Sequence, residues 1–302
     1  MTRDDLERRL FDARDCEAAV AALAEFFSAN ELVFGHGTDN ASDEAFWVLR
    51  HLQHWRDDVD WNARPEPALL SAAAGLAVRR VEERKPLAYL TGEAWFAGLR
   101  FSVDERVLVP RSPLAELIER GFAPWCSLEP GDRVLDVGTG SGCIAIAIAH
   151  YCPDVLVDAT DVSADALEVA AVNVARHGVR DRVRLQRADL FPPTDARYRV
   201  IVSNPPYVSA TEMAGLPPEY RHEPAGALAG GPTGFEPAER IVRGARARLT
   251  DDGCVFVEVG GGAEAFAEAH PDWPLTWLEF ERGGDGVFVL HAAEIEEFLR
   301  PR

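Results

Sequence analysis

Residues 134–142 read Val134-Leu135-Asp136-Val137-Gly138-Thr139-Gly140-Ser141-Gly142, an apolar run that ends in a loop with glycine at every second position. This pattern predicts a buried strand that turns sharply into a helix. Glycine is needed where a backbone must turn tightly and let a ligand approach closely. A dinucleotide-binding loop would have its third glycine one position later, so the spacing here indicates a different cofactor.

Short β-branched runs alternate with helical stretches from about residue 114 onward. Strands are expected at residues 133–137, 155–160, 182–185, 198–203, 254–259, 275–280 and 287–290, with helices at 143–150, 164–177, 235–249 and 262–269. Such alternation predicts an α/β fold with a doubly wound parallel sheet and helices on both faces. The last two strands flank Gly283-Gly284-Asp285-Gly286, which predicts a terminal antiparallel hairpin.

The first part of the chain follows a helical pattern instead, because its apolar residues recur three and four positions apart. The spacing is seen in Val20, Leu23, Phe26 and Phe27, and again in Phe46, Leu49, Leu52 and Trp55. Residues 92–109 then alternate with a period of two around Gly98, as a β-hairpin followed by a strand at 107–109 would. We therefore predict a helical domain at 1–90, a β-hairpin linker at 91–112 and a catalytic domain at 113–302.

The composition limits the classes of function. The chain has 302 residues, and its 31 Lys and Arg against 50 Asp and Glu give a net charge of -19. That charge disfavours stable binding of nucleic acid and suits a basic partner, although solubility alone also explains it. The five cysteines never form a C-x-x-C pair, which argues against a zinc site or a disulfide framework. We therefore expect no bound metal. No apolar run approaches the roughly 20 residues of a membrane span, so we expect a cytoplasmic protein.

Carboxylates follow the next two predicted strands after the glycine loop. Asp161 stands where a carboxylate accepts hydrogen bonds from both ribose hydroxyls of a nucleoside. Asp189 can accept from an adenine amino group, with Leu190 or Phe191 against the ring. The alternative for both aspartates is a helix cap or a solvated loop. Together, three successive strand ends predict a site for an adenosine-containing cofactor.

A second motif, Asn204-Pro205-Pro206-Tyr207, directly follows the strand at 198–203. The two prolines fix φ and lack N–H donors, so the carbonyls of Asn204 and Pro205 form a rigid cradle of acceptors. An amide NH2 or an exocyclic aromatic amine fits this cradle, with one N–H on the Asn204 side-chain oxygen and the other on the Pro205 carbonyl. Tyr207 would stack on the planar group. The alternative is a Pro-Pro turn that merely ends a strand.

An amide nitrogen is a poor nucleophile because its lone pair is delocalised into the carbonyl. No side-chain base deprotonates it at neutral pH, so we expect orientation to drive the reaction, with Asn204, Pro205 and Tyr207 as the catalytic residues. Positioning of this kind can contribute on the order of 7 kcal/mol or more. The Asn204 and Pro205 oxygens would also offset the positive charge that develops on the nitrogen.

With these motifs, the chain resembles the glutamine side-chain-nitrogen methyltransferases of the HemK type over essentially its whole length. Further resembling stretches lie at residues 88–91, 103–113, 216–224, 276–280 and 283–288. The resemblance implies a Rossmann-like, class I methyltransferase domain with a small helical N-terminal domain and a hairpin linker. It also implies that S-adenosylmethionine is the cosubstrate and that the methyl group goes to the side-chain amide of a protein glutamine.

The family's site residues carry over onto the matching positions of this chain. Cofactor contacts are expected from Asp136, Gly138, Thr139, Gly140, Ser141, Gly142, Asp161, Asp189, Leu190 and Asn204. Substrate contacts are expected from Asn204, Pro205, Pro206 and Tyr207. Arg111, His222 and Glu223 either line the site or belong to loop structure. The helical domain is expected to dock the substrate, since one glutamine must be chosen among many.

Within the family, the resemblance favours the branch that methylates a glutamine of large-subunit ribosomal protein uL3, a basic protein. The branch that acts on peptide chain release factors tends to carry Arg-Pro-x-Thr-Glu, and Ser112 and Pro113 break that pattern. Release factors remain an alternative substrate. Adenine-N6 methyltransferases of nucleic acids use the same cradle, but no basic target-recognition segment is recognisable here. A non-catalytic binding protein would show a damaged loop or cradle, and both are intact.

Overall fold

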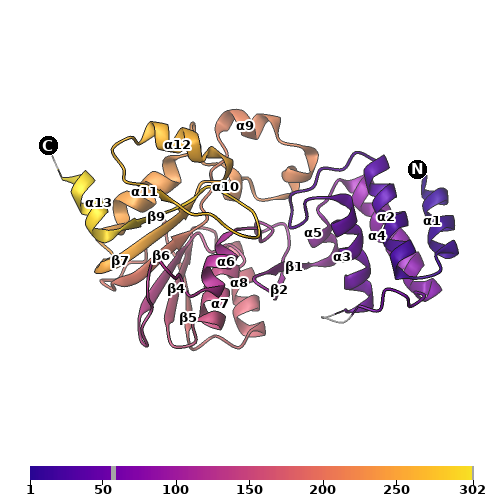
Figure 1. Ribbon diagram of the computed structural model, residues 1–302, viewed down its shortest axis with the longest axis horizontal. Coiled ribbons are helices and arrows are strands. Elements are labelled where there is room, and N and C mark those ends of the chain that lie inside the picture. Colours follow the sequence, from indigo (N-terminus) through magenta and orange to yellow (C-terminus); the bar gives the residue numbers. More distant parts are fainter. Residues whose placement is uncertain (56–58, 301–302) are drawn as a thin grey trace. The chain divides into compact units, whose positions relative to one another are not determined.

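The structure, a computed structural model, describes residues 1–55 and 59–300. The chain divides into two units, Met1–Glu93 with Pro217–His222 and Ala94–Leu216 with Glu223–Arg302 (Figure 1). Most of the predicted linker thus lies in the second unit, and a short segment of the predicted catalytic domain lies in the first. Among the described residues, no helix is long and apolar enough to cross a membrane.

The first unit consists of helices that pack their apolar faces on one another. They are α1 (Arg3–Asp12), α2 (Cys16–Ala29), α3 (Ala41–Gln53), α4 (Pro67–Glu83), α5 (Leu87–Thr91) and the short 3-10 helix η1 (Pro218–His222). Side-chain caps from Thr2, Asp15 and Asn40 start the first three helices by accepting backbone N–H groups. The predicted helical pattern is confirmed, and its apolar stripes supply Phe27 and Leu49 to the buried core.

The second unit opens with the predicted hairpin, β1 (Glu93–Phe96) and β2 (Leu99–Ser102), and continues as a seven-stranded sheet. In spatial order its strands are β5 (Val183–Arg187), β4 (Leu156–Asp161), β3 (Arg133–Val137), β6 (Tyr198–Ser203), β7 (Leu249–Glu258), β9 (Val287–His291) and β8 (Thr276–Trp277). The first five are parallel, and β9 is antiparallel to both its neighbours. The doubly wound sheet and the terminal hairpin are both confirmed.

Helices cover both faces of this sheet (Figure 1). One face carries α6 (Leu114–Glu119), α7 (Cys143–Tyr151) and α8 (Ala164–Arg176), and the other carries α11 (Glu236–Ala245), α12 (Ala263–Ala269) and α13 (Ala292–Leu299). Shorter elements follow β6 and β7 in the sequence: α9 (Ala210–Gly215), α10 (Ala225–Leu228) and the 3-10 helix η2 (Gly260–Gly262). Because the central strands are buried on both faces, they hold their carboxyl ends rigidly at one edge of the sheet.

Two predicted strands were wrong in whole or in part. Residues 107–109 form no strand, because the N–H of the last one donates to the carboxylate of Glu223 (3.1 Å) rather than to a neighbouring strand. The strand predicted at 275–280 shrinks to Thr276–Trp277. Just beyond it, the backbone N–H groups of Glu281 and Arg282 donate to the carboxylate of Glu116 (3.1 Å each). At 107–109 a buried side chain therefore replaces strand pairing, whereas Leu278 still donates its N–H to the Val287 carbonyl (2.9 Å).

Candidate active site

The glycine loop and the Asn-Pro-Pro-Tyr motif follow neighbouring strands at the point where the strand order reverses. Val137 ends β3 opposite Ser203, which ends β6, and the Ser203 hydroxyl donates to the Val137 carbonyl (2.7 Å). Gly138 and Asn204 are therefore the next residues of two adjacent parallel strands. The predicted neighbourhood of the two motifs is confirmed, and it coincides with the usual ligand position in such sheets.

Asp136 is completely buried near the end of β3. Its Oδ2 accepts the Thr139 hydroxyl (2.6 Å) and the Ala145 N–H (3.1 Å), whereas Oδ1 has no hydrogen-bond partner among the residues described. Burial raises the pKa of Asp136 to about 7, against the effect of those two donors. A buried acceptor without a partner is costly, so Oδ1 is suited to a donor or a positive charge on a bound ligand.

The glycine loop has a backbone that other residues rarely adopt. Gly138, Gly140 and Gly142 have φ values of 73°, 54° and 82°. A Cβ at Gly142 would lie 3.2 Å from the Cβ of Ala170, so the third glycine also lets α7 pack against α8. At Gly138 and Gly140 no described atom lies within 4 Å of such a Cβ, which leaves space beside the loop.

Asp161, the last residue of β4, ties that strand to the glycine loop. Its Oδ2 accepts the N–H of Gly140 and its Oδ1 accepts the N–H of Ser163, both at 2.9 Å. The second bond is a local turn before α8, but the first spans two strand ends. Each oxygen keeps a further lone pair, so the carboxylate can still accept two hydroxyls.

Asp189 and Leu190 follow β5. The Asp189 carboxylate is exposed and forms an ion pair with Arg240 (2.8 Å). Leu190 has a positive φ of 67°, and its carbonyl accepts the hydroxyl of Thr160 (2.6 Å). Thr160 also uses its own carbonyl to accept the N–H of Gly138 (2.8 Å). One residue of β4 thus connects the loops after β3 and β5.

In the second motif, Pro205 is buried and Asn204 is half-buried. The Asn204 side chain makes no hydrogen bond to any residue that the structure describes. The segment after the motif is fixed, because Val208 donates its N–H to the Leu228 carbonyl (2.9 Å) and accepts the N–H of Gly230 (2.8 Å). A rigid backbone with an available amide is the arrangement that the cradle needs.

The three residues left open by the sequence have structural partners. The Arg111 guanidinium donates to both oxygens of Glu223, at 2.6 and 2.7 Å. His222 belongs to the helical unit, where its Nε2 donates to the Glu83 carbonyl (3.0 Å). These contacts hold loops in place.

Sequence reasoning missed Asn173, which supports the glycine loop from α8. Its fully buried amide nitrogen donates to the carbonyls of Ser141 and Ser102 (2.9 Å each), and its oxygen accepts the Ser102 N–H (2.8 Å). The only signal was a polar residue at helical spacing from the apolar Val169 and Ala170. A single buried asparagine has no motif around it.

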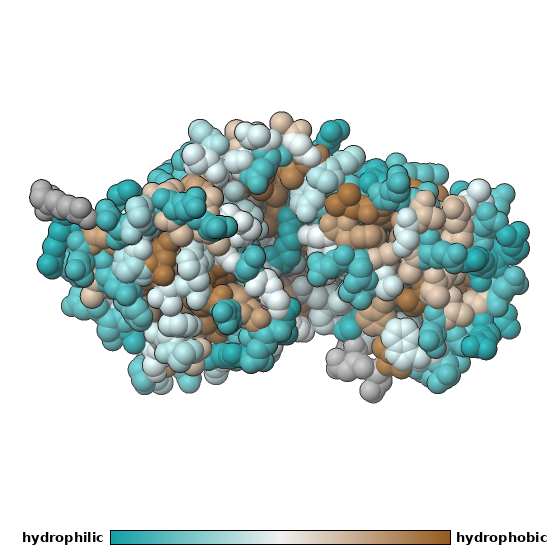
Figure 2. Space-filling view, turned by 45° about the horizontal axis from the view of Figure 1, so that its top comes forward, coloured by the Kyte–Doolittle hydropathy of each residue, from teal (hydrophilic) through white to brown (hydrophobic). Residues whose placement is uncertain are grey.

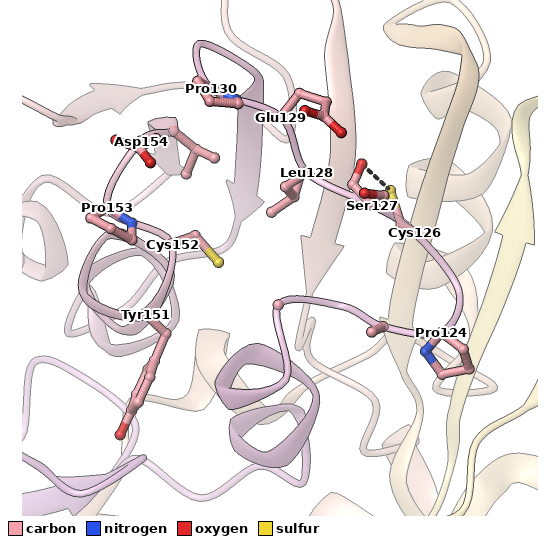
Figure 3. A pocket seen from close by; sticks show the side chains of 13 residues that line it. Pro124, Cys126, Ser127, Leu128, Glu129, Pro130, Tyr151, Cys152, Pro153 and Asp154 are labelled. Atoms are coloured by element: carbon pink, nitrogen blue, oxygen red, sulfur yellow. Dashed lines mark hydrogen bonds between the residues drawn. The ribbon is translucent and has the colours of Figure 1, made fainter.

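A cavity of about 420 Å³ lies at the amino ends of β3 and β4. Tyr151, Cys152, Pro153 and Asp154 line one side of it, and the segment from Pro124 to Pro130 lines the other (Figure 3). The glycine loop and Asn204 follow the carboxyl ends of the strands, so this cavity is at the opposite edge of the sheet and plays no part in the site.

Comparisons with known proteins agree with this geometry. The family model "Methyltransferase small domain" matches residues 125–215. The chain is 48% identical to the ribosomal protein uL3 glutamine methyltransferase of Bordetella pertussis, over 87% of this chain and 90% of that protein. It is 44% identical to the protein of the same name from Burkholderia pseudomallei, over 89% and 92%.

Among solved structures, the hMettl16 catalytic domain, in complex with the MAT2A 3′UTR hairpin 6, matches with a TM-score of 0.51. The match covers 81% of this chain and 91% of that domain at 16% identity, so it bears on the fold alone. With the family model and the observed sheet, it confirms the predicted Rossmann-like, class I methyltransferase fold.

Proposed function

We propose a mechanism for this site from the premise that the chain belongs to the family of ribosomal protein uL3 glutamine methyltransferases. The enzyme transfers a methyl group to the side-chain amide nitrogen of a glutamine in uL3. The observation that carries the proposal is the adjacency of Asn204 and the glycine loop at the ends of β6 and β3. That adjacency would bring a methyl donor and an amide acceptor together.

S-adenosylmethionine, when bound, supplies a methyl group attached to a positively charged sulfur. The residues present suit its parts: the unpartnered Oδ1 of Asp136 suits a charged donor, and the open space beside Gly138 and Gly140 suits a close approach. Asp161 has acceptor capacity for the ribose hydroxyls. Asp189 and Leu190 would hold the adenine, with Asp189 accepting from its amino group. We infer that these residues hold the methyl donor.

The residues of the chain itself would orient the acceptor. The Asn204 side-chain oxygen and the Pro205 carbonyl would each accept one N–H of the glutamine amide, which fixes the plane of the nitrogen. Pro206 keeps the turn rigid, and Tyr207 would cover the amide plane. Fixed acceptors also stabilise the positive charge that develops on nitrogen, and the surplus proton can leave to water afterwards.

The helical unit would select the protein substrate. Two large apolar side chains, Phe11 and Trp61, are 46% and 41% exposed there. Hydrophilic side chains cover most of the visible surface of each unit, with small apolar patches among them (Figure 2). A net charge of -19 would draw a basic ribosomal protein toward the enzyme, and the apolar patches would then fix its position.

The first test incubates the full chain with labelled S-adenosylmethionine and, separately, with purified uL3, a release factor or DNA. Mass spectrometry then identifies the labelled residue. We expect methylglutamine in uL3 alone. Label in the release factor would keep the mechanism but change the substrate, and label on adenine would overturn the substrate class.

A second test changes the cradle. Asn204→Ala should lower kcat about 100-fold or more, as loss of one charge-stabilising group does elsewhere, while S-adenosylmethionine binds within a few-fold of its original affinity. Turnover and calorimetric binding separate the two effects. Ser209→Ala is the matched control, because Ser209 caps α9 just beyond the motif. Equal losses of binding and turnover in Asn204→Ala would count against the cradle.

A third test addresses docking. Replacing Phe11 or Trp61 by alanine should raise KM for uL3 with little change in kcat, because neither residue belongs to the cofactor loops or to the cradle. Val172→Ala removes a similarly exposed apolar side chain, 55% exposed, from α8 in the other unit, and should leave KM unchanged. If all three variants behave alike, the helical unit does not select the substrate through these residues.

A further inference from the structure

A buried glutamate that no sequence motif singled out stands beside the cradle. Glu258 is the last residue of β7, and Val257 before it lies opposite Ser203 at the end of β6. Its side chain is only 3% exposed. Asn204 therefore has the glycine loop on one neighbouring strand and Glu258 on the other.

Two hydroxyl groups hold the two oxygens of Glu258. The Ser112 hydroxyl donates to Oε2 at 2.5 Å, and the Tyr207 hydroxyl donates to Oε1 at 3.4 Å. The Ser112 oxygen also accepts the N–H of Leu114 (3.2 Å), which fixes it at the start of α6. The carboxylate thus links a rigid helix start to the tyrosine of the cradle.

Three glycines leave room for Tyr207. A Cβ at Gly260 would lie 2.7 Å from Cε2 of the Tyr207 ring. A Cβ at Gly234 would lie 2.5 Å from the Tyr207 carbonyl oxygen, and one at Gly230 would lie 2.8 Å from its Cα. Backbone from two segments, the loop at 230–234 and the turn at Gly260, therefore encloses the residue, and Glu258 holds its hydroxyl end.

We propose that Glu258 is a positioning residue that anchors the Tyr207 hydroxyl and so fixes the ring plane on which the substrate amide is aligned. This inference rests on the proposed function, because the ring plane matters only when a planar amide lies on it. An effect on alignment should appear in kcat. KM for S-adenosylmethionine should not change, since its contacts are assigned to the loops after β3, β4 and β5.

The ionisation of Glu258 makes this role depend on pH. Burial raises the pKa of Glu258 to about 7, against the Ser112 and Tyr207 hydrogen bonds and the Arg111 charge, and the Asp285 carboxylate adds to the rise. The ionised carboxylate accepts both hydroxyls, whereas the protonated form carries its own hydrogen and loses acceptor capacity. We therefore expect kcat to rise with pH through about 7.

The experiment measures kcat and KM for uL3 methylation by the full-length enzyme across pH 5.5 to 8.5 (about three pH units around that pKa). Glu258→Gln keeps the shape of the side chain but cannot ionise. It should lower kcat about 10-fold and leave KM for S-adenosylmethionine unchanged. It should also abolish the acidic limb of the pH profile, which is the fall of kcat below about pH 7. Glu258→Asp, which can ionise, should restore part of the limb.

Ser112→Ala distinguishes positioning from a merely structural role. Loss of its hydrogen bond to the ionised form should raise the pKa of Glu258 and move the acidic limb to higher pH. Tyr207→Phe should abolish the limb as Glu258→Gln does, and the double variant should be no slower than the slower single variant. Calorimetric binding of S-adenosylmethionine and thermal unfolding show whether each variant is folded.

Two results would overturn the inference. One is an acidic limb that persists in Glu258→Gln, which would assign it to another group such as Asp136. The other is full additivity of the effects of Glu258→Gln and Tyr207→Phe on kcat, which would show that the two side chains act independently. If the unaltered enzyme fails to methylate uL3 at all, the proposed function fails instead, so the two failures are distinguishable.

Discussion

The helical unit and the active-site edge of the sheet bury carboxylates in different ways. In the helical unit, the fully buried Arg80 lies between two glutamates, with Nε 2.5 Å from Glu44 and NH1 3.6 Å from Glu219. At the sheet edge, Asp136 and Glu258 are equally buried, but among the described residues they bond only hydroxyl and N–H donors.

The difference separates carboxylates that hold the fold from carboxylates that serve a site. Burial raises the pKa of Glu44, and the charge and hydrogen bond of Arg80 oppose that rise. In the described part of the chain, Asp136 and Glu258 have no guanidinium bonded to them, and burial raises the pKa of each to about 7. An arginine satisfies a carboxylate permanently, whereas neutral donors leave it sensitive to pH and to a ligand.

Arg80→Met should have the largest effect, because it leaves the buried Glu44 without its cation. Glu219 keeps its ion pair with Arg84 at 2.7 Å. Breaking one side of a buried ion pair costs about 3–5 kcal/mol, so the midpoint of urea unfolding should fall markedly. Arg79→Met is the matched control. Arg79 precedes Arg80 in the same helix, but its side chain is 53% exposed and pairs with Glu83 on the surface. Equal midpoints for the two variants would show that the buried pair does not hold the helical unit.

Asp136→Asn tests the other side of the comparison. Protonated Asp136 contributes stability that is complete below its ordinary pKa of 3.8 and is lost as the pH rises through about 7. The amide does not ionise, so the variant should lose less stability than the parent between pH 5.5 and 8. Its affinity for S-adenosylmethionine should fall about 10-fold, because the carboxylate charge is gone.

Asp158→Asn is the control for that variant, because Asp158 is buried in the next strand but is paired. Its Oδ2 accepts from Arg133 (2.6 Å) and from the Tyr198 hydroxyl (2.8 Å). This variant should lose stability and keep its affinity for S-adenosylmethionine. Calorimetry and urea unfolding at both pH values make the comparison, and identical behaviour of the two variants would remove the distinction between site and fold carboxylates.

The alternation of strands and helices was predictable because each element is set by local periodicity. The adjacency of Gly138 and Asn204 was also predictable, because a doubly wound sheet brings these strand ends together. The strand expected at 107–109 failed for a physical reason: a distant carboxylate, Glu223, takes its backbone donor. Local pattern carries no information about a partner more than a hundred residues away.

The same limit explains which site residues were missed. The two motifs were found because the chain order concentrates them in short runs. Asn173 and Glu258 each act alone, from a helix and a strand whose other buried positions are apolar. Their roles depend on tertiary contacts with Ser141 and Tyr207, so only coordinates reveal them.

The smallest effect is expected at Asp189, an exposed carboxylate paired with Arg240. Solvent screens such a pair, so neither Asp189→Asn nor Arg240→Gln should change stability appreciably. If Asp189 accepts from the adenine amino group, Asp189→Asn should weaken S-adenosylmethionine binding by roughly 3-fold, because the amide oxygen accepts the same N–H without the carboxylate charge. Arg240→Gln leaves the carboxylate in place and should not weaken it. Calorimetry on both variants decides, because equal losses would assign the effect to the ion pair, and no loss in either would remove Asp189 from the site.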